Sequence, residues 1–166
     1  MSTDRVPWPP VGVTQRRLEL KELVSFVKSK VSDDASHHLA RYLAVRSAGV
    51  IEAVRDDVAD EYCRSVGPAR LHRRVSSGLR YGQGVRPNQL VEFMRTFDTD
   101  WADELDSWLK ANDARRSNDL GALVTSRHRV AHGDGERVTT SKALTWAACA
   151  IEVMDWLVKR FDPNSN

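Results

Sequence analysis

The sequence is poor in cysteine and has no long apolar run, and both features restrict its class. The chain has 166 residues and two cysteines, Cys63 and Cys149, which match neither a metal-binding spacing nor a disulfide framework. We therefore expect both thiols to be buried in a protein of a reducing, cytoplasmic compartment. The longest uncharged stretch near the C-terminus, 143–151, is much shorter than the ~20 residues of a membrane-spanning helix.

Strand-like alternation is also scarce, so the fold class expected is all-α. The prolines at the start of the chain, with no apolar run beside them, indicate a disordered tail over 1–13 and no secretory signal. A single helical domain is expected over 14–161, followed by a frayed tail over 162–166. The expected helices cover 14–31, 35–65, 68–79, 87–97, 100–109, 119–132 and 140–159.

The long helix expected over 35–65 presents two different stripes. Its apolar stripe is predicted to face the core and consists of Leu39, Leu43, Val50, Val54, Val58 and Tyr62. The second stripe mixes small and charged residues, namely Arg41, Ala44, Ala48, Glu52 and Arg55. Small side chains allow another backbone to approach closely, which would leave Glu52 beside that backbone.

Charge is unevenly distributed although the formal net charge is only +2. The segment 64–91 has no Asp or Glu and contains the arginines Arg64, Arg70, Arg73, Arg74, Arg80 and Arg86. The next segment, 92–119, contains eight acidic residues and four basic ones. Two interpretations are open: the basic block follows a phosphate backbone, or it is a solvated face that pairs with the acidic block.

The segment 126–133, with the sequence S-R-H-R-V-A-H-G, concentrates two histidines and two arginines at an expected helix end. His128 and His132 share one helix face at i,i+4, whereas Arg127 and His132 differ by about 140° around an ideal helix. Three interpretations are open. His132 simply complements the helix dipole, the histidines bind zinc with Asp134 or Glu136, or the segment is an acid–base and phosphate-binding site.

This segment resembles the R-x4-6-H motif of HEPN domains, with Arg127 and His132 as its two fixed positions and a polar residue, His128, after the arginine. The run from Arg46 to Glu52, R-S-A-G-V-I-E, is similar to the R-x-x-G-x-[IV]-E segment of HEPN domains of the RiboL-PSP type. The resemblance covers roughly 39–161. It implies a HEPN-type helical bundle that dimerises through the helices around the motif.

The resemblance also implies an activity, that of a metal-independent endoribonuclease with no cofactor. Attack of an RNA 2′-hydroxyl on the adjacent phosphate would occur in a composite cleft formed by two copies of the motif. His132 is expected to transfer protons, Arg127 to stabilise charge on the phosphorane, and His128 to orient the phosphate or the partner histidine.

Further residues have auxiliary roles in this interpretation. Glu52 and Arg46 are expected to support the motif, Glu52 by fixing Arg127 or a protonated histidine; alternatively Glu52 pairs with Arg55 within its helix. The expected RNA-binding residues are Arg129, Arg73, Arg74, Arg80 and Tyr81, the last as a base-stacking side chain in a Gly-flanked loop.

The expected function is thus that of a HEPN-type toxin or antiviral effector that acts on RNA as a homodimer. A protein antitoxin or a neighbouring defence protein would be a further partner, and no membrane is involved. The alternative is a non-catalytic module that binds nucleotide or RNA or serves as a scaffold.

Overall fold

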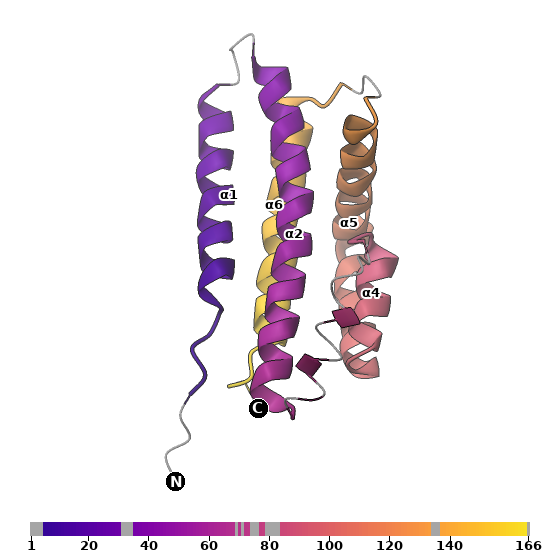
Figure 1. Ribbon diagram of the computed structural model, residues 1–166. Helices are drawn as coiled ribbons and strands as arrows, with labels where there is room; N and C mark the ends of the chain where they lie inside the picture. The colour runs from indigo at the N-terminus through magenta and orange to yellow at the C-terminus, as the bar shows by residue number, and fades with distance from the viewer. Residues whose placement is uncertain are drawn as a thin grey trace.

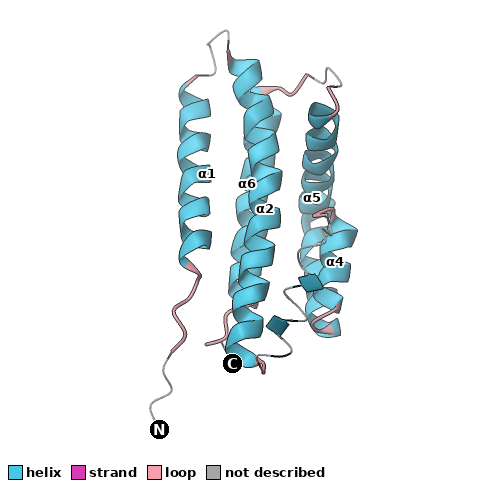
Figure 2. Cartoon of the chain, in the orientation of Figure 1, coloured by secondary structure: helices cyan, strands magenta, loops and turns pink. Residues whose placement is uncertain are grey.

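The computed structural model describes residues 5–30, 35–68, 70, 72–73, 77–78, 84–133 and 137–165. In these ranges every regular element is an α-helix, so the all-α prediction is confirmed (Figures 1 and 2). The helices are α1 (Val11–Ser29), α2 (Ser36–Val66), α4 (Pro87–Arg95), α5 (Thr99–Ala131) and α6 (Thr140–Arg160). Within the same ranges, no helix combines the length and the apolarity that crossing a bilayer requires.

The four long helices alternate in direction along the bundle (Figure 1). Helix α2 is central and packs against α1, α5 and α6, while the short helix α4 packs on α5. Because the directions alternate, α5 ends at the same end of the molecule at which α2 and α6 begin. This topology brings the segment 126–133 to one end of the bundle, close to two helix N-termini.

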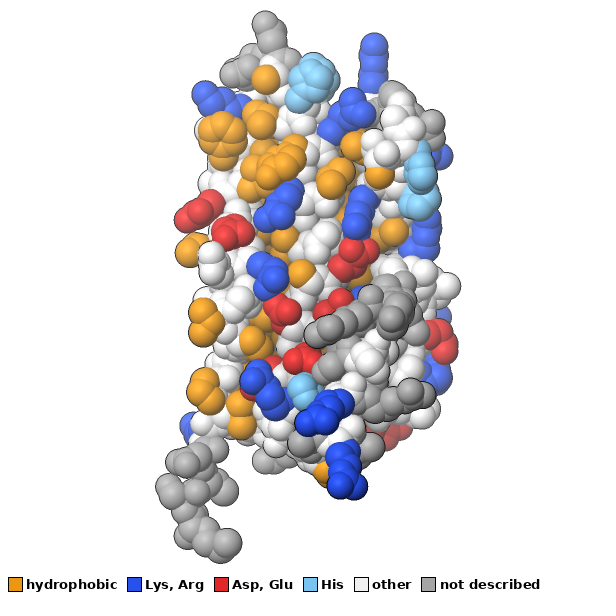
Figure 3. Space-filling model, in the orientation of Figure 1, with side chains coloured by type: hydrophobic (Ala, Val, Ile, Leu, Met, Phe, Trp, Pro, Cys, Tyr) orange, Lys and Arg blue, Asp and Glu red, His pale blue; other side chains and the backbone are white. Residues whose placement is uncertain are grey.

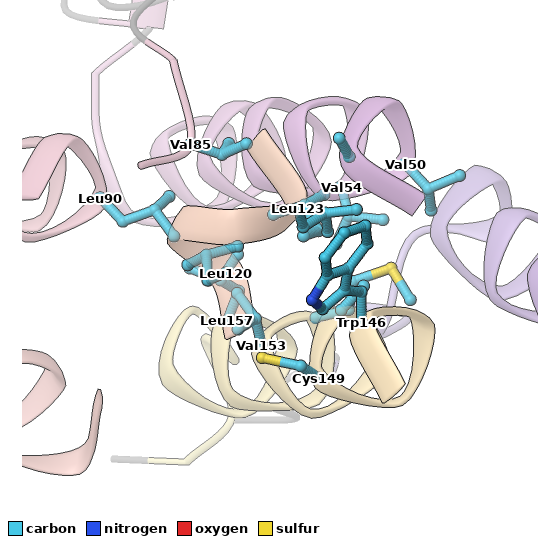
Figure 4. Packing of buried hydrophobic residues seen from close by; sticks show 14 of the residues in the cluster. Val50, Val54, Val85, Leu90, Leu120, Leu123, Trp146, Cys149, Val153 and Leu157 are labelled. Atoms are coloured by element: carbon cyan, nitrogen blue, oxygen red, sulfur yellow. The ribbon is translucent and has the colours of Figure 1, made fainter. Parts of the chain in front are cut away.

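Helix α2 is buried on more than one side because it lies between neighbours. Ala44 and Ala48, from the predicted small-residue stripe, are fully buried, as is Leu43 from the apolar stripe. Leu39 and Tyr62, at the ends of the apolar stripe, are only partly buried. Figure 4 shows the core that α2 shares with α5 and α6, with Val50, Val54, Leu120, Leu123, Trp146, Cys149, Val153 and Leu157 labelled.

Helix α5 is broken inside the region expected to separate two helices. Its backbone is non-helical only at 111–114, where Asn112, Asp113 and Ala114 have φ values of 54°, 56° and 56°. Helical geometry resumes at Arg115, and Arg115 and Arg116 both donate to Glu152 of α6, at 2.8 and 2.6 Å. The break is therefore shorter than the interval 110–118 between the two expected helices.

The structured part of the chain extends beyond the expected boundaries at 13 and 162. Helix α1 begins at Val11, and upstream of it the indole Nε1 of Trp8 donates to the carbonyl of Val158 at 2.9 Å. Asn164 accepts from the Val6 backbone N–H at 3.2 Å and donates to the Val6 carbonyl at 3.1 Å. These contacts attach both expected tails to the end of the bundle at which α6 finishes.

The Cys149 thiol lies in the core, and its burial raises its pKa to about 12; the carboxylates of Asp119 and Glu152 act in the same direction. At pH 8 only roughly one thiol in 10⁴ would then be ionised, and the thiolate is the reactive form. We expect iodoacetamide to spare Cys149 in the native protein at pH 8 and to modify it in urea, as read by peptide mass spectrometry. Equal rates in the two conditions would contradict the buried position.

Candidate active site

The histidine-containing motif occupies the last turns of α5. The helix ends at Ala131, and the backbone N–H of His132 still donates to the carbonyl of His128 at 3.1 Å. Gly133 then adopts a φ of +76°, a left-handed conformation that glycine takes without the steric penalty of a Cβ atom. The predicted helix end at Gly133 agrees with this turn, which leaves His132 at the junction of helix and loop.

His128 and His132 form an exposed pair of imidazoles. Their ring centroids are 4.7 Å apart with an interplanar angle of 59°, as the i,i+4 spacing predicts. Both side chains are accessible to solvent. Each imidazole ring has one nitrogen that can donate a proton and one that can accept a proton, and both rings can be reached by a substrate from solvent.

The Arg127 side chain extends from a different side of α5 than the two histidines, toward α2. Its Nη1 lies 2.6 Å from Oε1 of Glu52, and the two side chains are 34% and 32% exposed. The alternative Glu52–Arg55 pair does not form: Arg55 is only 2% exposed and binds Asp56 at 2.7 Å. Thus Glu52 of α2 forms an ion pair with Arg127, the arginine of the motif, on α5.

This ion pair orients the guanidinium of Arg127 through one nitrogen atom, Nη1. An ion pair that is one-third exposed contributes at most about 1 kcal/mol to stability, so its main effect is on orientation. The contact uses Nη1 of Arg127, and a guanidinium carries further N–H donors in a planar fork. Arg127 can therefore bind an anion from solvent while Glu52 holds it.

Arg46 is not brought to the motif. It lies six residues before Glu52, which is about 240° around the helix. Its Nη2 is 3.6 Å from Oε2 of Glu19 on α1, and it lines a groove between α1 and α2. The R-x-x-G-x-I-E run therefore contributes Glu52 alone to this site.

The expected RNA-binding residues are only partly covered by the structure. Arg129 and Arg73 are described and exposed. Arg74, Arg80 and Tyr81 lie outside the described residues.

The arginines of the basic block 64–91 for which the structure gives a polar partner do not pair with the acidic block 92–119. Arg64 pairs with Glu61 of its own helix, and Arg86 donates to the Thr125 hydroxyl at 3.3 Å. Acidic side chains of 92–119 form ion pairs with cations outside the basic block, as in the pairs Glu104–Arg160 and Asp106–Lys110. These pairs favour neither an RNA-binding role for the block nor pairing between the two blocks.

The zinc interpretation has no third ligand among the described residues. In that part of the chain no group of three or more His, Cys, Asp and Glu side chains is arranged around a common point. Asp134 and Glu136, the ligands considered with His128 and His132, lie outside it.

Two further arginines lie at this end of the bundle and were not among the predicted site residues. Arg41 of α2 and Arg137, just before α6, line one cavity. A signal for Arg41 existed in the sequence, because it is eleven residues before Glu52 and so shares its helix face within about 20°. Arg137 carried no such signal, since it precedes the helix that it flanks.

Comparisons with protein-family models, with curated proteins and with solved structures found no match to this chain. The side chains of the site provide two exposed imidazoles for proton transfer and one oriented guanidinium for anion binding.

Replacing Glu52 by Gln should leave the fold nearly unchanged while freeing Arg127. We expect the free energy of unfolding in urea to fall by less than about 1 kcal/mol, because the pair is a third exposed. The Arg127 side-chain Nη–H signal in nitrogen-15 NMR should change its chemical shift, because Nη1 is the atom that contacts Glu52. Asp106→Asn, which removes the exposed pair with Lys110, is the matched control and should not move that signal. A loss above about 3 kcal/mol would instead identify the pair as a structural element.

Proposed function

We propose that this chain is a metal-independent endoribonuclease of the HEPN type, of the toxin or antiviral-effector class. One observation carries the proposal: Glu52 holds the guanidinium of Arg127 in the same helix end that exposes the imidazoles of His128 and His132. This set of groups provides what phosphodiester cleavage by a 2′-hydroxyl requires, namely proton transfer and charge stabilisation.

His132 is the proton-transfer group in this mechanism. Acting as a base, it accepts the proton of the 2′-hydroxyl while the oxygen attacks the adjacent phosphorus. The P–O5′ bond then breaks, a second acid protonates the leaving 5′-oxygen, and the products are a 2′,3′-cyclic phosphate and a 5′-hydroxyl. Acid–base assistance of this kind typically contributes about 10²–10⁴-fold to the rate.

The need for a second acid leads to a homodimer. His132 supplies one proton-transfer group per chain, so two chains that meet at the ends of their α5 helices would supply the base and the acid together. The exposure of both histidines and of Arg129 is compatible with this arrangement, since a buried motif could not be shared.

Arg127 and His128 have supporting roles in the cleavage step. As charge grows on the non-bridging phosphate oxygens, the donors of Arg127 that Glu52 does not use bind them. His128, whose ring centroid lies 4.7 Å from that of His132, orients the phosphate or the partner histidine, and Arg129 contacts the RNA backbone. Loss of a single well-aimed donor of this type costs about 10²–10³-fold in rate.

The second candidate function is a non-catalytic module that binds RNA or nucleotide or scaffolds another protein. The same cationic helix end would serve it, because phosphate binding needs arginine but no proton-transfer group. The two functions differ in what His132 does, and cleavage assays on substituted protein separate them.

We expect His132→Ala to abolish RNA cleavage and Arg127→Ala to reduce it by at least about 10²-fold. His128→Ala should be less damaging because its role is orientation. Cleavage is measured on end-labelled single-stranded RNA, with detection of the cyclic phosphate, and in cells as growth arrest by the wild type alone.

Each variant must be folded and dimeric for this comparison, as checked by circular dichroism and sedimentation. His38→Ala is the matched control, because His38 is an exposed histidine at the start of α2 that has no part in the proposed chemistry. A folded His132→Ala dimer that cleaves at the wild-type rate would refute the ribonuclease mechanism and leave the binding module.

Cleavage should also persist in excess EDTA. The proposed chemistry uses imidazole and guanidinium groups, and neither requires a metal-bound water. Loss of cleavage in EDTA with recovery on addition of zinc or magnesium would replace this mechanism by one in which His128 and His132 bind the metal.

A further inference from the structure

Helix α1 is apolar on two opposite sides. Its inner side packs against α2 and α6. The inner apolar residues, each at most 2% exposed, are Val13, Leu20 and Val27. On the outer side, Val11, Leu18 and Phe26 are 84%, 57% and 49% exposed. Hydrophobic side chains recur along this outer edge of α1, at the left of the view in Figure 3. An apolar face of this kind, rimmed by polar residues, is typical of a surface that contacts another protein.

The spacing of the exposed residues makes the outer face complementary to itself. Leu18 follows Val11 by seven residues and precedes Phe26 by eight. On an ideal helix Val11 lies within about 20° of Leu18, and Phe26 lies about 80° from Leu18 on the same flank as Val11. When two copies of α1 run antiparallel with their Leu18 side chains together, Val11 of each copy is level with Phe26 of the other. The three apolar residues of one copy therefore meet the same three residues of a second copy.

The polar residues of the outer face agree with the same pairing. Gln15 of one copy is level with Glu22 of the other, and Thr14 is level with Lys21, in each case to within about one residue, or ~1.5 Å. Gln15 donates one amide N–H to Glu19 of its own helix at 3.1 Å, and its second amide N–H can donate to Glu22 of the other copy. Glu22 and Lys21 each meet an uncharged polar side chain, which avoids like-charge repulsion at the centre of the contact.

A groove beside the outer face widens the surface available to a second copy. It has a volume of about 640 Å³ and lies between α1 and the last turns of α6. Thr14, Leu18 and Lys21 line it from α1, and Trp8 and Val158 line it further in. Because Nε1 of Trp8 already donates to the Val158 carbonyl at 2.9 Å, the indole ring is an apolar wall with its polar atom satisfied. A second copy can thus bury apolar surface of both α1 and α6.

We propose that the outer face of α1 binds a second copy of this chain, by antiparallel pairing of two α1 helices about a two-fold axis at Leu18. In Figure 1, α1 and α5 lie on opposite sides of α2, so this contact is separate from the end of α5. The resemblance to HEPN domains covers roughly 39–161 and does not include α1. A chain with two different two-fold contacts assembles into a tetramer or a longer array, so α1 adds a level of assembly to the dimer proposed above.

Sedimentation equilibrium at micromolar concentration tests the contact. Leu18→Glu places two carboxylates together at the axis and should at least halve the mass of the assembly. Val66→Glu is the matched control, because Val66 is 54% exposed at the end of α2, and it should leave the mass unchanged. Both side chains are more than half exposed, so both variants should keep the wild-type circular dichroism.

Cross-linking tests the antiparallel register in a Cys63→Ser background. Under mild oxidation Leu18→Cys should form a disulfide between two copies, because the two side chains meet at the axis. Val11→Cys should link to Phe26→Cys when the two proteins are mixed. It should not link to itself, because the two Val11 positions are about 21 Å apart along the helices. Lys110→Cys, at an exposed position on α5, is the control for random collision.

Equal masses for the wild type and folded Leu18→Glu would overturn the proposal and leave the outer face of α1 for a different protein. Cross-linking of Val11→Cys to itself would overturn it too, because that link requires parallel helices. Neither result depends on cleavage. If the wild type cleaves RNA and the masses are equal, the proposed ribonuclease stands and the α1 contact fails. If no RNA is cleaved while Leu18→Glu halves the mass, the α1 contact stands and the proposed function fails.

Discussion

The close approach of α2 to its neighbours is the constraint on which the candidate site depends. Ala40, Ala44 and Ala48 are completely buried along α2, and their small side chains let adjacent helices pack at short range. One turn further along, Glu52 reaches Arg127 of α5 at 2.6 Å. Larger residues at the alanine positions would force the helices apart, and the ion pair would be lost although neither partner had changed.

Arg55 and Arg127 show how burial determines whether an arginine keeps donors for a ligand. Arg55 is 2% exposed, binds Asp56 at 2.7 Å and donates to the Gly84 carbonyl at 3.1 Å. Burial raises the pKa of the Asp56 carboxyl, and the hydrogen bond from Arg55 opposes that shift. Such an arginine has its donors occupied and attaches the segment before α4 to α2. Arg127 is 34% exposed and keeps donors for a ligand.

The alternating directions of the helices bring the histidine motif and two further arginines to one end of the molecule. Helices α2 and α6 begin there, α5 finishes there with its two histidines, and Arg41 and Arg137 line a cavity in between.

The sequence by itself determined the helical class, the extents of α2 and α6 to within a residue or two, and the turn at Gly133. These features follow from local periodicity, capping and backbone conformation, which depend on neighbours within a few residues. The i,i+4 contact between His128 and His132 belongs to the same group.

Only the tertiary structure decided which charged groups meet. Glu52 had a possible partner three residues away in Arg55 and contacts Arg127 instead, because α5 packs against that face of α2. Arg46 shares the sequence run of Glu52 but points to Glu19 on α1. Arg41 and Arg137 meet at a cavity that no local pattern connects. Periodicity specifies the face of a helix on which a side chain lies, whereas its partner depends on how whole helices pack.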